Sequence, residues 1–395
     1  MSKIQAPRGT QDVLPFEFVV RRRIEDTAGA AALCYGYEPI VTPTIEHTEL
    51  FARTSGEGSD VVTKEMYTFP DRAGRSLTLR PEGTAGICRA YVEHGLHREP
   101  QPVKFFAFES MFRYAAPQKG RFREFWQLDV EAIGSPEPAL DAEQIRLFVE
   151  ILRQLGIEGA RLELNSIGDR ACRPAYLDTL RRFLAEHESD LDDDARTKAR
   201  TSPLRVFDTK NPRVRAVLDD APRIGDSLCD DCRAHFDEVK SLLDAFGVSY
   251  ELVPALVRGL DYYTRTVYEF VNDALDAAES TICAGGRYDY LVEEIGGPPT
   301  PGDGWASGVE RDAMSVTPAR DWPRPNDVFF LLEQGGDRTA MLSSMMDLRA
   351  KGWLCDADYA GRSVKGQLTQ AKRLRAKKII RVGPDTDIAA EVAKL

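Results

Sequence analysis

The chain has 395 residues, of which 43% are hydrophobic, 29% charged and 9% aromatic, and its formal net charge is −11. This length predicts two or three domains, and the aromatic content excludes a mostly disordered protein. The negative net charge argues against indiscriminate binding to nucleic acid, and no apolar run is long enough to span a membrane. Because the N-terminus also lacks an apolar leader, we expect a cytoplasmic protein.

In the first part of the chain, apolar spacing and turn residues predict alternating helices and strands. The predicted helices cover residues 15–34, 81–91 and 140–155, and Pro81 is expected to open the second of them. The predicted extended segments cover residues 38–43, 76–80, 103–114 and 122–134. The last two of these form a hairpin, because Pro117-Gln118-Lys119-Gly120-Arg121 between them has the composition of a loop.

The second part of the chain predicts a helical insertion and a separate small domain. Residues 169–248 are mostly polar with helical spacing, and a strand follows at 264–270. Three prolines make residues 317–326 a linker. Beyond the linker, strands at 327–332, 353–359 and 377–382 alternate with helices at 338–351 and 363–376 and a short helix to Leu395, which predicts an α/β domain.

Seven cysteines are scattered along the chain, which is typical of reduced thiols rather than of a disulfide framework. Cys229 and Cys232, with His235 three residues further on, have the spacing of half a metal site. A structural zinc site needs four ligands, usually from two such pairs, and the sequence has no second Cys-x-x-Cys pair. We therefore assign no metal-binding side chains from the sequence.

Eight lysines and arginines and no acidic residue lie between Gly361 and Pro384. Such a local basic surface on an acidic protein could hold a phosphate backbone, or it could be one solvated helix face. The sequence leaves both interpretations open.

Five arginines stand in segments rich in glycine and tyrosine: Arg113, Arg121, Arg123, Arg258 and Arg311. No Walker-type or Rossmann-type glycine loop is present, and the five histidines lie outside all these segments. A guanidinium keeps its charge and matches phosphate oxygens with a planar fork. Any one of these arginines could form an ordinary surface salt bridge, but several in one cleft would neutralise a triphosphate.

Several motifs resemble, in order, those of the class II histidyl-tRNA synthetase family. Pro7-Arg8-Gly9-Thr10-Gln11-Asp12 and Leu79-Arg80-Pro81-Glu82-Gly83-Thr84-Ala85 resemble its opening, and residues 111–127 resemble its motif 2. Residues 256–269 and Gly285-Gly286-Arg287-Tyr288-Asp289 are similar to its two histidine signatures, and Gly308-Val309-Glu310-Arg311 to its motif 3. The terminal α/β unit resembles its anticodon-binding domain.

This resemblance implies an α+β fold: a class II synthetase-type antiparallel sheet flanked by helices, with a helical insertion and a small C-terminal α/β domain. It implies a catalytic domain at 1–320, with the insertion at about 169–248, and a shortened anticodon-binding-like domain at 326–395. The implied activity is histidine–tRNA ligase: ATP, with Mg²⁺, activates L-histidine to histidyl-adenylate, and the histidyl group then passes to the 3′ end of tRNA(His). A homodimer is also implied.

The resemblance assigns roles by position. Arg258 and Arg113 are the implied catalytic residues. ATP is implied to contact Arg113, Arg121, Arg311 and Glu310. Histidine is implied to contact Glu82, Gly83, Thr84, Gln127, Glu131, Arg258, Tyr262, Tyr263 and Tyr288. The residues implied to contact tRNA are Gln118, Lys119, Arg362 and Lys365.

Four positions depart from the family pattern: Ala115, Trp126, Ala284 and Asp312. Ala115 replaces a frequent glutamate that contacts adenine, and Asp312 replaces an apolar residue, so it needs a partner if it is buried. The C-terminal domain also ends early. Two alternatives therefore stay open: a tRNA-independent histidine-adenylating ligase, and a regulatory synthetase-like paralogue that serves histidine biosynthesis.

Overall fold

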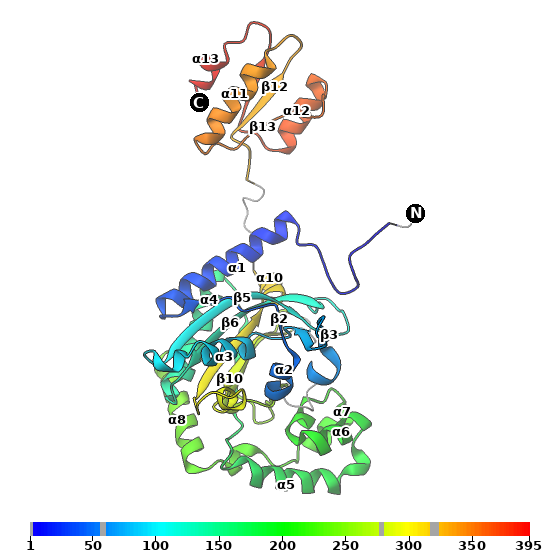
Figure 1. Ribbon diagram of the computed structural model, residues 1–395, viewed down its shortest axis with the longest axis vertical. Helices are drawn as coiled ribbons and strands as arrows, with labels where there is room; N and C mark the ends of the chain where they lie inside the picture. The colour runs from blue at the N-terminus through cyan, green and yellow to red at the C-terminus, as the bar shows by residue number, and fades with distance from the viewer. Residues whose placement is uncertain (1–2, 56–60, 276–279, 317–323) are drawn as a thin grey trace. The chain divides into compact units, whose positions relative to one another are not determined.

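The computed structural model describes residues 3–55, 61–275, 280–316 and 324–395 (Figure 1). The chain divides into two compact units, Met1–Thr317 and Pro318–Leu395. Most of the predicted linker, residues 317–323, lies outside the described residues. Among the described helices, none combines the length and apolar character that a bilayer crossing requires.

The first unit is built on an eight-stranded sheet with the order β1-β5-β6-β11-β10-β9-β7-β8. Its strands are β1 (Glu38–Pro39), β5 (Val103–Phe112), β6 (Glu124–Ile133), β7 (Ala160–Ser166), β8 (Glu251–Leu252), β9 (Thr264–Asn272), β10 (Thr281–Arg287) and β11 (Gly302–Gly308). The central strands pair antiparallel, whereas the short edge strands β1 and β8 pair parallel with β5 and β7. The expected α+β fold with an antiparallel sheet between helices is confirmed.

One face of this sheet carries the main apolar core. The helices over it are α1 (Pro15–Cys34), α4 (Pro138–Leu155), α8 (Asp230–Ala245) and α10 (Val309–Ser315). Side chains of a strand alternate between its two faces, so Leu128 and Val130 of β6 pack into this core. Gln127, Asp129 and Glu131 of the same strand therefore lie on the opposite face. That face carries a row of buried polar groups.

Helices and a smaller sheet border the polar face. They are α2 (Thr48–Ser55), α3 (Thr84–Glu93), α9 (Leu291–Glu294) and a sheet of β2 (Ile45–His47), β4 (Ser76–Leu79) and β3 (Tyr67–Pro70). The insertion contributes α5 (Arg173–Glu186), α6 (Asp193–Thr201) and α7 (Pro212–Leu218). Figure 1 shows these three insertion helices at the end of the unit opposite α1.

The prediction that Pro81 opens the second helix is wrong, because α3 begins at Thr84. The Pro81 carbonyl accepts a hydrogen bond from Arg113 Nε at 2.7 Å. The Glu82 carboxylate accepts one from the Ala85 backbone N–H at 3.0 Å. These contacts hold the segment before the helix in a turn, which presents Glu82 to the polar face of the sheet.

The second unit is a small α/β fold with the predicted alternation. A parallel sheet with the order β13-β12-β14 contains β12 (Val328–Leu332), β13 (Cys355–Ala357) and β14 (Lys378–Val382). The helices are α11 (Arg338–Ala350), α12 (Val364–Arg373) and α13 (Ile388–Val392). Phe330 and Phe329 of β12 pack into cores on opposite faces, as expected for a central strand covered on both sides.

Candidate functional site

A cavity of about 390 Å³ lies over the polar face of the large sheet. Its wall includes Arg113, Arg258 and Arg311, which are far apart in the sequence. Three guanidinium groups around one cavity offer charged hydrogen-bond donors that suit a polyanionic ligand. Of the five arginines that the sequence singled out, the structure places Arg121 in this wall as well, whereas Arg123 does not line the cavity and its guanidinium lies over the Tyr114 ring.

Arg113 lies one residue beyond the end of β5, with its guanidinium 5.1 Å from the centre of the Phe125 ring. Burial lowers the pKa of Arg113, and Glu65 and Glu82 oppose this shift. A poorly solvated cation gains more from an anionic ligand than an exposed one does, because the local dielectric is low. Arg121, in the hairpin loop, also lines the cavity and forms a 2.9 Å ion pair with Glu65.

Arg258 lies in the loop that precedes β9. Its Nη1 is ion-paired with Glu269 of β9, and its guanidinium lies 5.6 Å from the centre of the Tyr263 ring. Glu269 also accepts a hydrogen bond from Thr281 Oγ1 at 3.0 Å. These contacts hold the Arg258 side chain against the wall of the cavity, between the strands and the loop that carries Tyr262 and Tyr263.

Glu310 and Arg311 stand at the start of α10, where β11 ends. Arg311 donates to the Thr281 carbonyl at 2.5 Å and to the Gly120 carbonyl at 3.4 Å, so it links β10 to the hairpin loop. Both carboxylate oxygens of Glu310 lie 3.1 Å from the Trp126 backbone nitrogen. Burial raises the pKa of Glu310.

Part of the cavity wall, next to Arg113, consists of buried acceptors. Among the described residues, Glu82 Oε2, Gln127 Oε1 and both carboxylate oxygens of Asp129 have no hydrogen-bond partner. Burial raises the pKa of Glu82 and raises that of Asp129 further, because neighbouring carboxylates add to the effect. Buried acceptors without donors are costly, so they suit a ligand with N–H groups.

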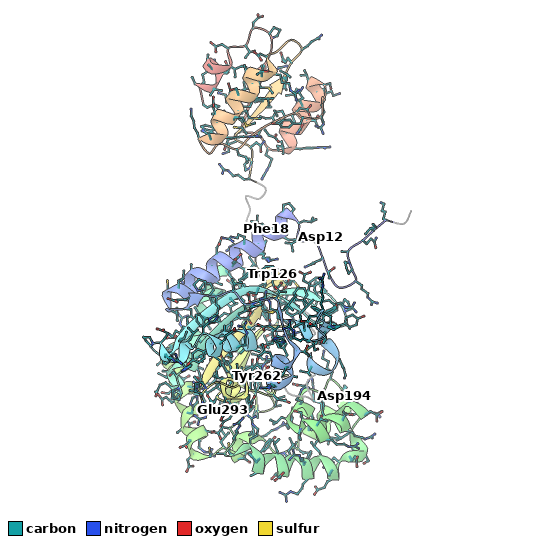
Figure 2. The ribbon with its side chains drawn as sticks, viewed as in Figure 1. Asp12, Phe18, Trp126, Asp194, Tyr262 and Glu293 are labelled. Atoms are coloured by element: carbon teal, nitrogen blue, oxygen red, sulfur yellow. The ribbon has the colours of Figure 1, made fainter. Side chains whose placement is uncertain are left out.

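A hydrogen-bonded layer supports this part of the cavity wall from behind. Glu131 accepts hydrogen bonds from Thr84 Oγ1 and Tyr288 OH, each at 2.5 Å, and burial raises the pKa of Glu131. Gly304 faces Glu131 across the β6–β11 pair, and a Cβ there would overlap the carboxylate. The Tyr262 and Tyr288 rings meet edge to face at 6.0 Å; Tyr262 is labelled in Figure 2.

The structure separates the residues predicted from the resemblance into three groups. Those that line the cavity are Glu82, Thr84, Arg113, Arg121, Gln127, Arg258, Tyr262, Tyr263, Glu310 and Arg311. Gly83, Glu131 and Tyr288 do not line it, and the last two form the supporting layer. Gln118 and Lys119 belong to the hairpin loop but are not part of the cavity wall, and Arg362 and Lys365 lie in the second unit.

Some residues of the cavity wall were not predicted from the sequence. The most informative are Asp129 and Glu269. Asp129 could have been predicted from the sequence. Residues two apart on a strand share a face, and Gln127 of the same strand was already a candidate. Glu269 lay at the end of a recognised motif, but only the fold shows that its carboxylate meets Arg258.

The departures from the family pattern fall in different surroundings. Ala115 and Ala284 line the cavity, so both bear directly on ligand contacts. Trp126 lies outside the cavity wall and packs against Phe108, and the Arg21 guanidinium lies 3.2 Å from the centre of its ring. Gly285 does not line the cavity; a Cβ there would collide with the Gly304 carbonyl of the neighbouring strand.

Asp312 is fully buried and has a partner, as its polarity requires. Its Oδ2 lies 2.5 Å from Ser307 Oγ, and Ser307 donates its hydroxyl hydrogen to the Ile282 carbonyl at 2.9 Å. Since one hydroxyl has one hydrogen, the contact with Asp312 is satisfied when the aspartic acid is protonated and donates. Burial raises the pKa of Asp312 to about 7, which agrees with this arrangement.

We expect Asp312→Asn to stabilise the protein above neutral pH. The raised pKa means that the folded chain binds the proton more tightly than the unfolded chain, so wild-type stability falls as pH rises from 3.8 to about 7. The variant does not titrate there, and its free energy of unfolding at pH 8 should exceed that of wild type by up to about 4 kcal/mol. Urea denaturation measured at several pH values tests this.

The matched control is Asp194→Asn, a change at an exposed aspartate of α6 that is labelled in Figure 2. It should leave the pH dependence of unfolding unchanged. Equal stability of wild type and Asp312→Asn at pH 8 would contradict a raised pKa for Asp312 in the folded protein.

Known proteins match both the sequence and the fold. A family model described as Histidyl-tRNA synthetase matches residues 9–311. The histidine–tRNA ligase of Thermosynechococcus vestitus is 46% identical over 385 residues, covering 96% of this chain and 89% of that protein. The histidine–tRNA ligase of Solidesulfovibrio magneticus is 46% identical over 393 residues, covering 99% of this chain and 92% of that protein.

The structural comparison agrees. The crystal structure of apo S. aureus histidyl-tRNA synthetase superimposes with a TM-score of 0.80 at 37% identity, covering 96% of this chain and 92% of that one. The family expected from the motifs is thus confirmed independently by sequence and by fold. This chain belongs to the histidyl-tRNA synthetase family.

Proposed function

We propose that this protein is a histidine–tRNA ligase that activates L-histidine with ATP, releases pyrophosphate, and transfers the histidyl group to the 3′ end of tRNA(His). The observation that carries the proposal is the composition of one cavity. Arg113, Arg258 and Arg311 surround its anion-binding part, and buried acceptors without donors line the remainder. A triphosphate needs the cationic surroundings, and an amino acid with its ammonium group needs the acceptors. The two ligands must also be neighbours to react.

In this proposal the arginines hold the nucleotide in position for attack. Arg113 contacts the α-phosphate, while Arg121 and Arg311 contact the outer phosphates. Arg258 lies beside both the α-phosphate and the histidine carboxylate, so it reduces their mutual repulsion as the carboxylate oxygen attacks phosphorus. Catalysis then rests on position and on stabilised charge, and no protein nucleophile is needed.

The acceptor-rich part of the cavity suits the rest of histidine. Glu82 and Gln127 offer oxygens to the α-ammonium group, which is a donor of three hydrogen bonds. Tyr262 and Tyr263 border the space for the imidazole, whose two nitrogens need one acceptor and one donor. Apolar amino acids would leave these buried groups unpaired and so bind much more weakly.

We also propose that Mg²⁺ enters with ATP. Mg²⁺ is usually held by one or two carboxylates together with substrate phosphates, which reduces the charge on the departing pyrophosphate. Glu310 fits this role, because it is a half-buried carboxylate in the cavity wall that accepts a hydrogen bond from the Trp126 backbone N–H.

The test is ATP–pyrophosphate exchange with each of the twenty amino acids, followed by charging of bulk tRNA. We expect exchange that requires histidine, and charging of one tRNA family. Absence of exchange would support a regulatory paralogue, and exchange without charging would support a tRNA-independent ligase. Neither alternative has a specific observation in its favour, since the arginines of the cavity are all present.

Contacts with tRNA are proposed for Gln118 and Lys119 of the hairpin loop and for Arg362 and Lys365 of the second unit. Removing residues 318–395 should therefore leave histidine-dependent exchange within about threefold of wild type and lower the rate of tRNA charging at least about 100-fold, the cost of roughly 3 kcal/mol of lost binding. Both rates are measured on the same preparation. Unchanged charging would mean that the second unit does not bind tRNA.

We propose a homodimer in the cytoplasm, where charged tRNA is used. Leu14 and Phe18, one helical turn apart at the start of α1, are 62% and 54% exposed, and apolar side chains exposed on one face favour a protein interface; Phe18 is labelled in Figure 2. Phe18→Glu should shift the mass measured by light scattering at micromolar concentration from dimer to monomer. Phe246→Glu, at an exposed phenylalanine elsewhere, is the control. A monomeric wild-type protein would exclude the proposal.

A further inference from the structure

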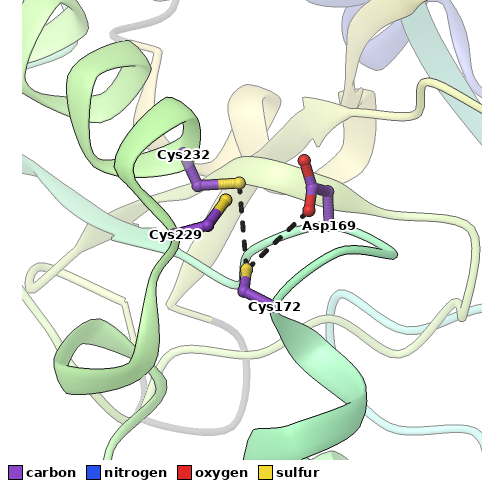
Figure 3. Close-up of side chains that lie close together, drawn as sticks. All are labelled: Asp169, Cys172, Cys229 and Cys232. Carbon is purple, nitrogen blue, oxygen red and sulfur yellow. Dashed lines mark hydrogen bonds between the residues drawn. The ribbon is translucent and has the colours of Figure 1, made fainter.

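Outside the cavity, four potential metal ligands meet where the helical insertion leaves and rejoins the sheet domain. They are Asp169, Cys172, Cys229 and Cys232, and their ligand atoms all lie within 4.8 Å of one another (Figure 3). The sequence has no second Cys-x-x-Cys pair. The second pair is an Asp-x-x-Cys, Asp169 and Cys172, which has the same spacing as Cys229 and Cys232.

The distances fit one tetrahedral ion. Cys172 Sγ lies 3.9 Å from Cys232 Sγ and 3.8 Å from Asp169 Oδ1. With zinc–sulfur bonds of 2.3 Å and zinc–oxygen bonds near 2.1 Å, tetrahedral geometry places ligand atoms about 3.6–3.8 Å apart. These two distances are within about 0.2 Å of the tetrahedral values, and the longest separation in the set, at most 4.8 Å, would shorten by about 1 Å when an ion binds.

The surroundings prepare these groups for a cation. Asp169, Cys172 and Cys232 are buried, and Cys172 and Cys229 are the N-cap residues of α5 and α8, so the two helix starts bring the thiols together. Arg265 donates to Asp169 Oδ2 at 3.2 Å, while Oδ1 accepts from the Ala171 backbone N–H at 2.9 Å and faces Cys172 Sγ. Such an outer contact on a ligating carboxylate is typical of metal sites.

Two further details define the ligand set. Gly168 has a φ of +62°, and a Cβ there would lie 2.6 Å from Cys172 Sγ, so glycine makes room for the thiol. His235, which follows Cys232 by three residues, is not among the ligands. Its Nε2 lies 2.8 Å from Asp141 Oδ2.

We propose that Asp169, Cys172, Cys229 and Cys232 bind one zinc ion, which ties together the two ends of the helical insertion. Three thiolates and one carboxylate in a tetrahedral arrangement favour Zn²⁺ over Mg²⁺ or Ca²⁺, which prefer all-oxygen sites. Four protein ligands leave no open position for water, so the ion is structural.

Hydrogen bonds also connect the helical insertion to the loop that lines the cavity. Arg173, the first residue of α5, donates to the Tyr263 carbonyl at 2.7 Å, and Ser202 of the insertion donates to Asp261 at 3.2 Å. Both acceptors lie in the loop that carries Arg258. Anchoring the insertion thus helps to fix that loop.

The test measures metal directly in the full chain. Protein purified under reducing conditions, stripped with a chelator and offered Zn²⁺ is dialysed and analysed by elemental mass spectrometry. We expect about one zinc per chain in wild type, and less than about one tenth of that in Cys172→Ser and Cys232→Ser, because a structural site needs all four ligands. Cys34→Ser and Cys355→Ser, changes at an exposed and a buried thiol elsewhere, should bind as wild type does.

Two measurements keep the result interpretable if a cysteine variant folds poorly. Wild type loaded with Co²⁺ should show the near-ultraviolet thiolate-to-metal absorption of a tetrahedral site, and Asp169→Asn should weaken zinc binding at least about tenfold with an unchanged circular dichroism spectrum. The proposal is overturned if reduced wild type binds no zinc, or if Cys34→Ser loses as much zinc as Cys172→Ser.

Discussion

Replacing Arg258 with alanine is expected to slow histidine-dependent ATP–pyrophosphate exchange by about 10²–10³-fold while changing the Kd for histidine by less than about tenfold. Arg258 lines the cavity and is held by Glu269 and by the loop before β9. In the proposed reaction its charge is most useful when the negative histidine carboxylate approaches the negative α-phosphate. An interaction that strengthens in the transition state affects the rate more than ground-state binding.

Three companion variants separate this role from a structural one. Arg258→Lys keeps the charge but loses the planar fork, so its rate should fall between wild type and Arg258→Ala. Glu269→Gln tests whether the lost ion pair alone explains the effect. Arg161→Ala removes an arginine with three carboxylate partners at the edge of the sheet and should leave exchange unchanged. Equal losses in rate and in histidine affinity for Arg258→Ala would argue against transition-state stabilisation.

Replacing Asp141 with alanine is expected to lower the free energy of unfolding by about 3–5 kcal/mol, because it leaves a buried cation without its main partner. Asp141 of α4 and Arg287 of β10 are both fully buried, and Arg287 Nε lies 3.1 Å from Asp141 Oδ1. His235 Nε2 lies 2.8 Å from the other carboxylate oxygen. The only other described carboxylate that pairs with Arg287 is Asp289, at 3.2 Å.

Urea denaturation at pH 7 measures this loss, with Asp193→Ala as the control. Asp193 also pairs with an arginine, Arg196 at 3.0 Å, but its side chain is fully exposed, so its removal should change stability little. A similar small effect for Asp141→Ala would show that the buried pair is dispensable.

The same pair has a consequence at low pH. Burial by itself would raise the pKa of Asp141, but the charges and hydrogen bonds of Arg287 and His235 together outweigh it and lower the pKa from 3.8 to about 2. The stabilisation is therefore present above the unfolded-state pKa of 3.8 and is lost as pH falls through about 2. Asp141→Ala lacks this part of the acid transition, which a circular dichroism titration would show.

Local patterns were sufficient for most elements. The helix at 15–34 was predicted with the bounds of α1, and the strands at 103–114 and 122–134 differ from β5 and β6 by one or two residues at an end. These predictions succeeded because the period of apolar residues reports which face is buried. The start of α3 was missed because contacts with Arg113, far away in the sequence, hold Pro81 in a turn before the helix.

In the candidate site, too, some residues were predicted from the sequence and others were found only in the structure. The motifs predicted four arginines that the structure places in one cavity wall, and guanidinium groups are suited to phosphate. The motifs did not show that Glu131 and Tyr288 form a layer behind the cavity, or that Asp129 lies in its wall. Those facts depend on which strands are neighbours: β6 lies between β5 and β11, and the facing Gly304 leaves room for the Glu131 side chain.

The amino-acid sequence by itself determined the family, the order of the elements, and the residue types that handle phosphate and imidazole, because each of these is encoded in short, contiguous stretches. Only the tertiary structure decided which side chains share a cavity, which acidic groups are buried as neutral acids, and that Asp169 and Cys172 meet Cys229 and Cys232. The physical reason is that pKa values, hydrogen-bond partners and metal geometry depend on distances between atoms that are remote along the chain, and the packing of the sheet and helices sets those distances.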